Sequence, residues 1–170
     1  MEYIMNHQTK LEQAHQESER IFRELLPKNG LAVREEQISL CHAILDALFQ
    51  NKIILCDAGT GIGKTYAYLT ACILLQKFYP ARVQPVVIST SSVALQDAVM
   101  KEYIPFLSQI LLKNRIISEP IHAAVRKGKG RFVCDELLSW RLTAVQEKNK
   151  NSEQLEALQS LQLHLDMDTV

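Results

Sequence analysis

Residues 53–69 read IILCDAGTGIGKTYAYL and join an apolar run, a glycine-rich turn and a Lys-Thr pair. The apolar run at 53–56 is short and continuous, which is typical of a strand that is covered on both faces of a parallel sheet. A helix is expected to begin at Lys64. A strand, a glycine turn and a helix start in this order aim several backbone N–H groups at phosphate oxygens. The stretch therefore predicts a phosphate-binding loop (P-loop).

The residue types in this loop predict binding of Mg-ATP. Lys64 would neutralise the β- and γ-phosphates, and the Thr65 hydroxyl would coordinate Mg²⁺; both are also the expected catalytic residues. Ala58 stands where the strict pattern has glycine, and the inner glycines supply the flexibility. The alternative is a glycine turn that only joins a strand to a helix. The expected nucleotide contacts in the loop are Ala58, Gly59, Thr60, Gly61, Ile62, Gly63, Lys64 and Thr65.

Apolar periodicity on both sides of the loop predicts an α/β domain. Spacings of three and four indicate helices over 35–49, 64–78 and 93–112. Continuous apolar runs indicate strands at 53–56, 85–90 and 121–125. Such alternation predicts a parallel sheet with right-handed crossovers. A helical stripe at 8–26 precedes this domain, and a leucine- and glutamine-rich helical stretch at 153–165 follows it.

Composition limits the possible functions. The 170 residues provide about one domain, and 19 basic side chains balance 19 acidic ones, so any contact with DNA must be local. Four widely spaced cysteines and the lack of a signal peptide argue against a disulfide scaffold and indicate the cytoplasm. No apolar run approaches the roughly 18 residues of a membrane span, so no membrane association is expected.

The loop and its surroundings resemble the DinG/XPD-like superfamily 2 DNA helicases. Residues 55–69 look like the family's E-A-G-T-G-T-G-K-T-x-A-Y-L segment, from which Asp57 and Ile62 depart. Upstream, Arg34-Glu35-Glu36-Gln37 resembles the R-x-x-Q element that reads the adenine edge. The resemblance implies that Arg34 and Gln37 contact the nucleotide and that Gln37 favours ATP over GTP. By itself, a glutamine at a helix start is most often a solvated residue.

Downstream, residues 87–97 read VISTSSVALQD and are similar to the family's I-S-T-x-[ST]-x-A-L-Q-[DE] segment. In the family this segment contacts the phosphates of single-stranded DNA. The resemblance assigns the same contacts to Ser89, Thr90 and Gln96, which would grip DNA without reading its sequence. For any single serine here, a polar cap at a helix start is an equal alternative.

Residues 126–134, RKGKGRFVC, look like the segment where the family's iron–sulfur insertion begins. Cys134 matches the first of four thiolates that hold a 4Fe-4S cluster in the family. No cysteine follows it, so we expect these 170 residues alone to bind no cluster; a cluster would need sequence beyond Val170. The basic side chains could also track single-stranded phosphates or form a plain solvated turn.

The resemblance covers roughly residues 30–138 and implies an incomplete RecA-like domain. The expected division is an N-terminal helix at 1–28, the partial ATP-binding domain at 29–126 and the helical start of the insertion at 127–170. The D-E-x-H carboxylates that position the attacking water are missing, and Asp166 and Asp168 do not imitate them. A second RecA-like domain is also missing.

The leading hypothesis is therefore the N-terminal portion of an ATP-dependent DNA helicase that binds Mg-ATP and single-stranded or forked DNA. Hydrolysis and unwinding would need motifs that these residues do not contain. Two alternatives remain. One is a stand-alone nucleotide- or DNA-binding module derived from a helicase, and the other is a P-loop kinase that acts on a small molecule.

Overall fold

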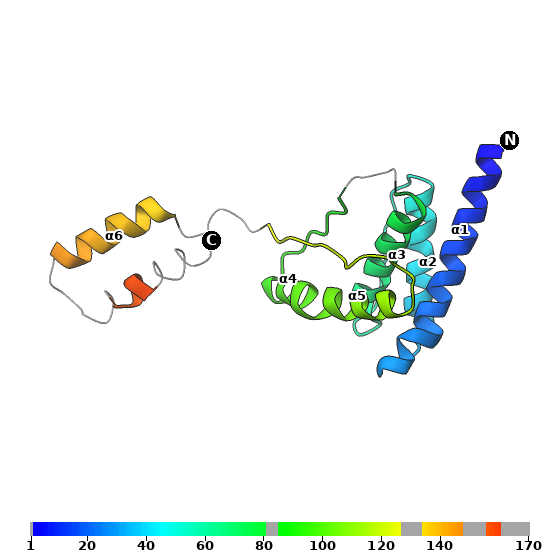
Figure 1. Cartoon of the computed structure of the whole chain (residues 1–170), viewed down its shortest axis with the longest axis horizontal. Coiled ribbons are helices and arrows are strands. Elements are labelled where there is room, and N and C mark those ends of the chain that lie inside the picture. Colours follow the sequence, from blue (N-terminus) through cyan, green and yellow to red (C-terminus); the bar gives the residue numbers. More distant parts are fainter. Residues whose placement is uncertain (1, 81–84, 127–133, 148–155, 161–170) are drawn as a thin grey trace. The chain divides into compact units, whose positions relative to one another are not determined.

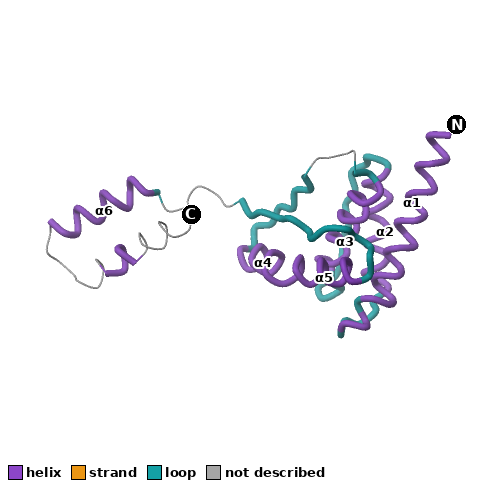
Figure 2. Tube along the Cα trace, viewed as in Figure 1, coloured by secondary structure: helices purple, strands orange, loops and turns teal. Residues whose placement is uncertain are grey.

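The protein is described by a computed structural model that covers residues 2–80, 85–126, 134–147 and 156–160. The chain divides into two compact units, Met1–Ala124 and Val125–Val170. The basic segment at 127–133 and the acidic pair Asp166 and Asp168 lie outside the described residues. Within the described ranges, the backbone is either helical or without regular structure, as Figure 2 shows.

Helices build the first unit, and three of them pack side by side (Figure 1). The predicted helices at 35–49 and 64–78 are confirmed to the residue, and the predicted helix at 93–112 is present as three consecutive helical segments. The elements are α1 (Glu2–Arg20), a π-helical turn η1 (Ile21–Leu25), a 3-10 turn η2 (Pro27–Asn29), α2 (Glu35–Phe49), α3 (Lys64–Phe78), α4 (Val93–Ala98), a π-helical turn η3 (Val99–Tyr103) and α5 (Ile104–Lys113).

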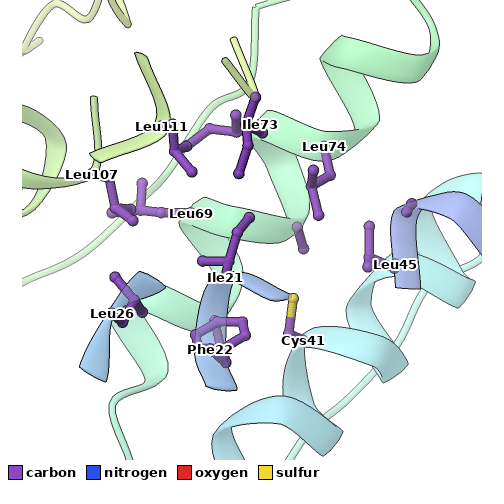
Figure 3. Packing of buried hydrophobic residues seen from close by; sticks show 14 of the residues in the cluster. Ile21, Phe22, Leu26, Cys41, Leu45, Leu69, Ile73, Leu74, Leu107 and Leu111 are labelled. Carbon is purple, nitrogen blue, oxygen red and sulfur yellow. The ribbon is translucent and has the colours of Figure 1, made fainter. Parts of the chain in front are cut away.

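The core lies where η1, α2, α3 and α5 meet (Figure 3). Phe22 comes from η1, Leu45 from α2, Leu74 from α3, and Leu107 and Leu111 from α5; all five are essentially inaccessible to solvent. Burial of each such side chain stabilises the fold by about 1.5–3 kcal/mol. The N-terminal helix and its π-helical turn are thus part of the same hydrophobic core as the helices on either side of the glycine loop.

The predicted parallel sheet is wrong: the described residues contain no strand (Figure 2). The segments 53–56, 85–90 and 121–125 are not paired in a ladder. Ile53 is 97% exposed, Leu55 96% and Val87 84%. An apolar run shows that a segment suits burial, but a strand also needs a neighbouring backbone in register, which no local pattern specifies. In this structure the helices bury one another's apolar faces, and the RecA-like α/β architecture is replaced by a helical one.

The second unit contains α6 (Asp135–Glu147) and a short helical segment at 156–160. Leu138 and Leu142 of α6 are buried, one turn apart on the same helix face, whereas Leu137 and Trp140 are exposed. The helix predicted at 153–165 falls partly outside the described residues. Across the part of the chain that the structure describes, no helix is long and apolar enough to cross a bilayer.

Candidate nucleotide site

The glycine-rich loop is shaped by two residues in the left-handed backbone region. Gly61 and Gly63 both have φ of +83°, which residues with a Cβ seldom adopt. Gly63 is also the N-cap of α3, so the helix begins at Lys64 without a capping side chain. The first N–H groups of a helix have no intrahelical acceptor and attract anions. The glycine turn and the helix start at Lys64 are present, whereas the strand expected before them is not.

Lys64 folds back over this loop. Its ammonium donates hydrogen bonds to the carbonyl oxygens of Ala58, at 2.9 Å, and of Gly59, at 2.7 Å. The side chain stays exposed, and Thr65 beside it is half-buried in the first turn of α3. A glycine-rich backbone, a helix N-terminus, a cation and an adjacent hydroxyl are the groups that a magnesium-bound triphosphate would need. The residues predicted for Mg-ATP thus lie together in one loop.

Arg34 and Gln37 reach the loop from the first turn of α2. The Arg34 guanidinium donates a hydrogen bond to the carbonyl oxygen of Gly61. The Gln37 amide donates to the carbonyl oxygen of Gly63 over 2.7 Å, and this glutamine is only 5% exposed. Gln37 is therefore buried, and the alternative of a solvated glutamine is excluded. Instead, the two residues predicted from the R-x-x-Q pattern lie against the predicted phosphate loop.

The space at Gly63 is filled by Gln37. A Cβ at position 63 would collide with the Gln37 amide nitrogen and lie 2.9 Å from its Cδ. At Gly61, by contrast, a Cβ would meet nothing within 4 Å. Glycine is thus required at position 61 for its backbone conformation, and at position 63 for both its conformation and the close approach of Gln37.

Two hydroxyls of the 87–97 segment, those of Thr90 and Ser92, accept local hydrogen bonds. Ser92 is the N-cap of α4, and its Oγ accepts from the Leu95 N–H at 3.2 Å. Thr90 Oγ1 accepts from the Ser92 N–H at 3.1 Å. Ser89 is exposed and Gln96 half-buried. The alternative of a polar cap therefore holds for Ser92, while Ser89 presents an open side chain.

An ion-pair network that the sequence analysis did not predict links η1 to the start of α2. Arg23 of η1 binds both carboxylate oxygens of Glu35, at 2.6 and 2.7 Å, and also pairs with Glu19. The hydrogen bond from Arg23 holds the pKa of Glu35 below its usual value. The Glu19–Arg23 spacing of four residues was a visible signal on one helix. The contact with Glu35 depends on the chain reversal at η2, which no spacing rule reveals.

The cysteines differ in their surroundings. Cys41 is buried and Cys72 half-buried in helices, whereas Cys56 and Cys134 are exposed. Burial raises the pKa of the Cys72 thiol to about 11, and burial together with the nearby Cys72 raises that of Cys41 further. Among the described residues, no group of three or more His, Cys, Asp or Glu is placed to hold a metal ion.

Comparison with known proteins decides the family. Over 115 residues the chain is 32% identical to the ATP-dependent DNA helicase YoaA of Escherichia coli, and over 117 residues it is 30% identical to the 3'-5' exonuclease DinG of Bacillus subtilis. The chain belongs to the DinG/YoaA family. The predicted resemblance is thereby confirmed. A further relative, the ATP-dependent DNA helicase DinG of Photobacterium profundum, is 30% identical over 112 residues.

The similarity covers most of this chain but little of its DinG/YoaA relatives. The matches take in 68% of the chain for YoaA and 69% for the Bacillus DinG, but only 16% and 11% of those proteins. For the Photobacterium DinG the shares are 61% and 15%. No protein-family model matches the chain. No solved structure matches it either.

Proposed function

We propose that this chain binds Mg-ATP through residues 58–65 and serves as the nucleotide-binding part of a DNA helicase. The observation that carries the proposal is the glycine loop itself, with its two left-handed glycines and Lys64 at the uncapped start of α3. The names of the relatives YoaA and DinG support ATP as the nucleotide and DNA as the substrate. Hydrolysis and unwinding require motifs that these 170 residues do not contain.

Binding of ATP begins with an exchange of acceptors at Lys64. The ammonium leaves the two carbonyl oxygens of Ala58 and Gly59 and takes the β- and γ-phosphate oxygens instead. The exchange is favourable because a hydrogen bond to an anionic oxygen is stronger than one to a neutral carbonyl. Thr65, on the same helical turn, would hold a magnesium ion, which would supply charge neutralisation at the phosphates. Gln37 would contact the adenine edge.

Single-stranded DNA binds, in this proposal, at the 87–97 segment. Ser89 is exposed, and Ser92, the N-cap of α4, lies three residues further along the chain. Hydroxyl, amide and backbone N–H groups bind phosphate oxygens without reading bases. Ser89, Thr90 and Gln96 are the proposed contacts, with single-stranded or forked DNA as the ligand.

A titration with fluorescent ATP tests the nucleotide site. We expect the 170-residue chain to bind Mg-ATP, and Lys64→Ala to weaken binding at least about tenfold, which corresponds to about 1.4 kcal/mol. The matched control is Lys113→Ala, which removes an exposed lysine at the end of α5 and should leave the affinity unchanged. Equal affinities of wild type and Lys64→Ala would refute the proposal.

DNA binding and ATP turnover test the remaining parts of the proposal. Anisotropy of a labelled single-stranded oligonucleotide should fall for Ser89→Ala relative to the exposed control Ser118→Ala. Affinity should decrease steeply with salt, because phosphate contacts release counterions. We expect no DNA-stimulated ATP turnover from these residues alone. Robust turnover would contradict the view that hydrolysis needs further motifs.

A further inference from the structure

Two side chains from one helical turn hold two carbonyl groups of the phosphate loop. Arg34 lies at the N-cap of α2, and Gln37 follows three residues later. Arg34 donates to the Gly61 carbonyl and Gln37 to the Gly63 carbonyl. The two accepting carbonyls thus lie two residues apart in the loop. Both glycines with positive φ therefore accept a hydrogen bond from α2, a contact that recognition of a base does not require.

The peptide plane links these contacts to phosphate binding. In a trans peptide the C=O of one residue and the N–H of the next point in opposite directions within one plane. The Gly61 carbonyl shares its plane with the Ile62 N–H, and the Gly63 carbonyl shares its plane with the Lys64 N–H. Holding the Gly61 carbonyl toward α2 therefore turns the Ile62 N–H away from α2, toward an incoming anion. The Gly63 carbonyl accepts both from Gln37 and, at 3.3 Å, from the Ala67 N–H of α3, so Gln37 and α3 together fix the direction of the Lys64 N–H.

Gln37 has the hydrogen-bonding capacity for this second task. A side-chain amide carries two N–H donors and an acceptor oxygen. One donor is used on the Gly63 carbonyl, which leaves the second donor and the oxygen for a nucleotide base. Its low exposure and the close fit against Gly63 fix the amide in place.

We propose that Arg34 and Gln37 are positioning residues that orient the Ile62 and Lys64 N–H groups for any polyphosphate, with or without a base. The inference rests on the proposed function, because it assigns a role within the same nucleotide site. This role differs from recognition of a base in the ligands that it affects. Binding of inorganic tripolyphosphate, which has no adenine, should depend on Arg34 and Gln37 as binding of ATP does.

Calorimetric titration of the 170-residue chain with Mg-ATP and, separately, Mg-tripolyphosphate tests this role. Arg34→Ala and Gln37→Met should each lower the affinity for both ligands by a similar factor of roughly ten, as loss of one strong hydrogen bond implies. Arg34→Lys should restore part of the affinity, because the ammonium can still donate to Gly61. Glu36→Gln, an exposed substitution on the same turn, is the matched control and should change neither affinity.

Each result has a distinct meaning. Weaker ATP binding with unchanged tripolyphosphate binding in both variants would overturn the inference and leave base reading as the only role. A wild-type chain that binds neither ligand would overturn the proposed function and the inference with it. Circular dichroism and the Tm report whether the variants fold. Should Gln37→Met fail to fold, Arg34→Ala carries the test, because Arg34 is exposed.

Discussion

The Gln37 amide donates to the Gly63 carbonyl oxygen over 2.7 Å, and no room remains between them for a methyl group on residue 63. The predicted adenine-reading element and the predicted phosphate loop, two separate segments of the sequence, are therefore in direct contact. Gly61 shares the φ of +83° with Gly63 but has open space where its Cβ would be. Substitutions at the two glycines can therefore be compared to distinguish the cost of backbone strain from the cost of a steric collision.

Alanine substitutions at these glycines should have unequal costs. Gly61→Ala adds only the strain of a left-handed conformation, about 1–2 kcal/mol of unfolding free energy. Gly63→Ala adds the same strain and a collision with Gln37, at least about 1 kcal/mol more. Denaturant unfolding measures both values, and in a double-mutant cycle Gln37→Ala should remove the excess at position 63. Equal costs at the two positions would contradict the close approach of Gln37.

Core and extended segments should respond differently to truncation. Phe22→Ala should lower the unfolding free energy by about 3–5 kcal/mol, because it empties a fully buried site in η1. Ile53→Ala should cost no more than about 0.5 kcal/mol, because Ile53 is 97% exposed. A loss of several kcal/mol for Ile53→Ala would show that this segment is buried, as the sequence alone suggested, and would contradict the helical architecture.

Helices could be predicted from the sequence, and strand pairing could not. The spacing of apolar residues along α2 and α3 is a local property, and the helix bounds followed from it. The apolar runs at 53–56 and 85–90 are equally visible, yet whether they pair depends on segments far away in the chain. For the same reason the sequence placed Cys56 at the end of a buried strand, while the structure exposes it.

In the candidate site, too, the residues could be predicted from the sequence and their contacts could not. The residues of the loop, together with Arg34 and Gln37, could be found because each lies within a pattern of fixed spacing. The hydrogen bonds from Arg34 to Gly61 and from Gln37 to Gly63 could not, because they depend on how α2 packs against α3. The cap formed by Ser92 was visible as an alternative, and only the structure shows that its hydroxyl is used.

The four thiols should fall into two classes of reactivity. Cys56 and Cys134 are exposed and should react rapidly with a disulfide reagent at neutral pH. Cys41 should react only after unfolding and Cys72 much more slowly than the exposed pair, because burial raises the pKa of both and limits access to them. Counting the thiols that react before and after addition of denaturant checks this. Four thiols of equal reactivity in the native chain would rule out the buried positions of α2 and α3.

A stacked histidine pair between α1 and α2 should make stability depend on pH. The rings of His15 and His42 lie 4.5 Å apart, with Ser18 and Glu19 of α1 and Asp46 of α2 around them. Burial, followed by the proximity of His15, lowers the pKa of His42, despite the opposing pull of Glu19 and Asp46. The folded state thus binds this proton less readily than the unfolded state, and stability falls as the pH drops below about 6.5.

The Tm of the wild type should therefore decrease between pH 7.5 and pH 5.5. His42→Gln keeps a polar side chain at the position but removes the titrating ring, so its Tm should change less over the same range. Comparison of the two profiles cancels the contributions of other groups. A His42→Gln profile as steep as that of the wild type would assign the pH dependence elsewhere.

Hydrogen exchange of the loop amides tests the central claim most directly. At saturating Mg-ATP, exchange should slow in peptides that cover residues 57–69, because the Ile62 and Lys64 N–H groups then bind phosphate oxygens. Lys64→Ala should show no such protection at the same nucleotide concentration. Unchanged exchange of the wild-type loop in the presence of bound Mg-ATP would contradict phosphate binding at this site.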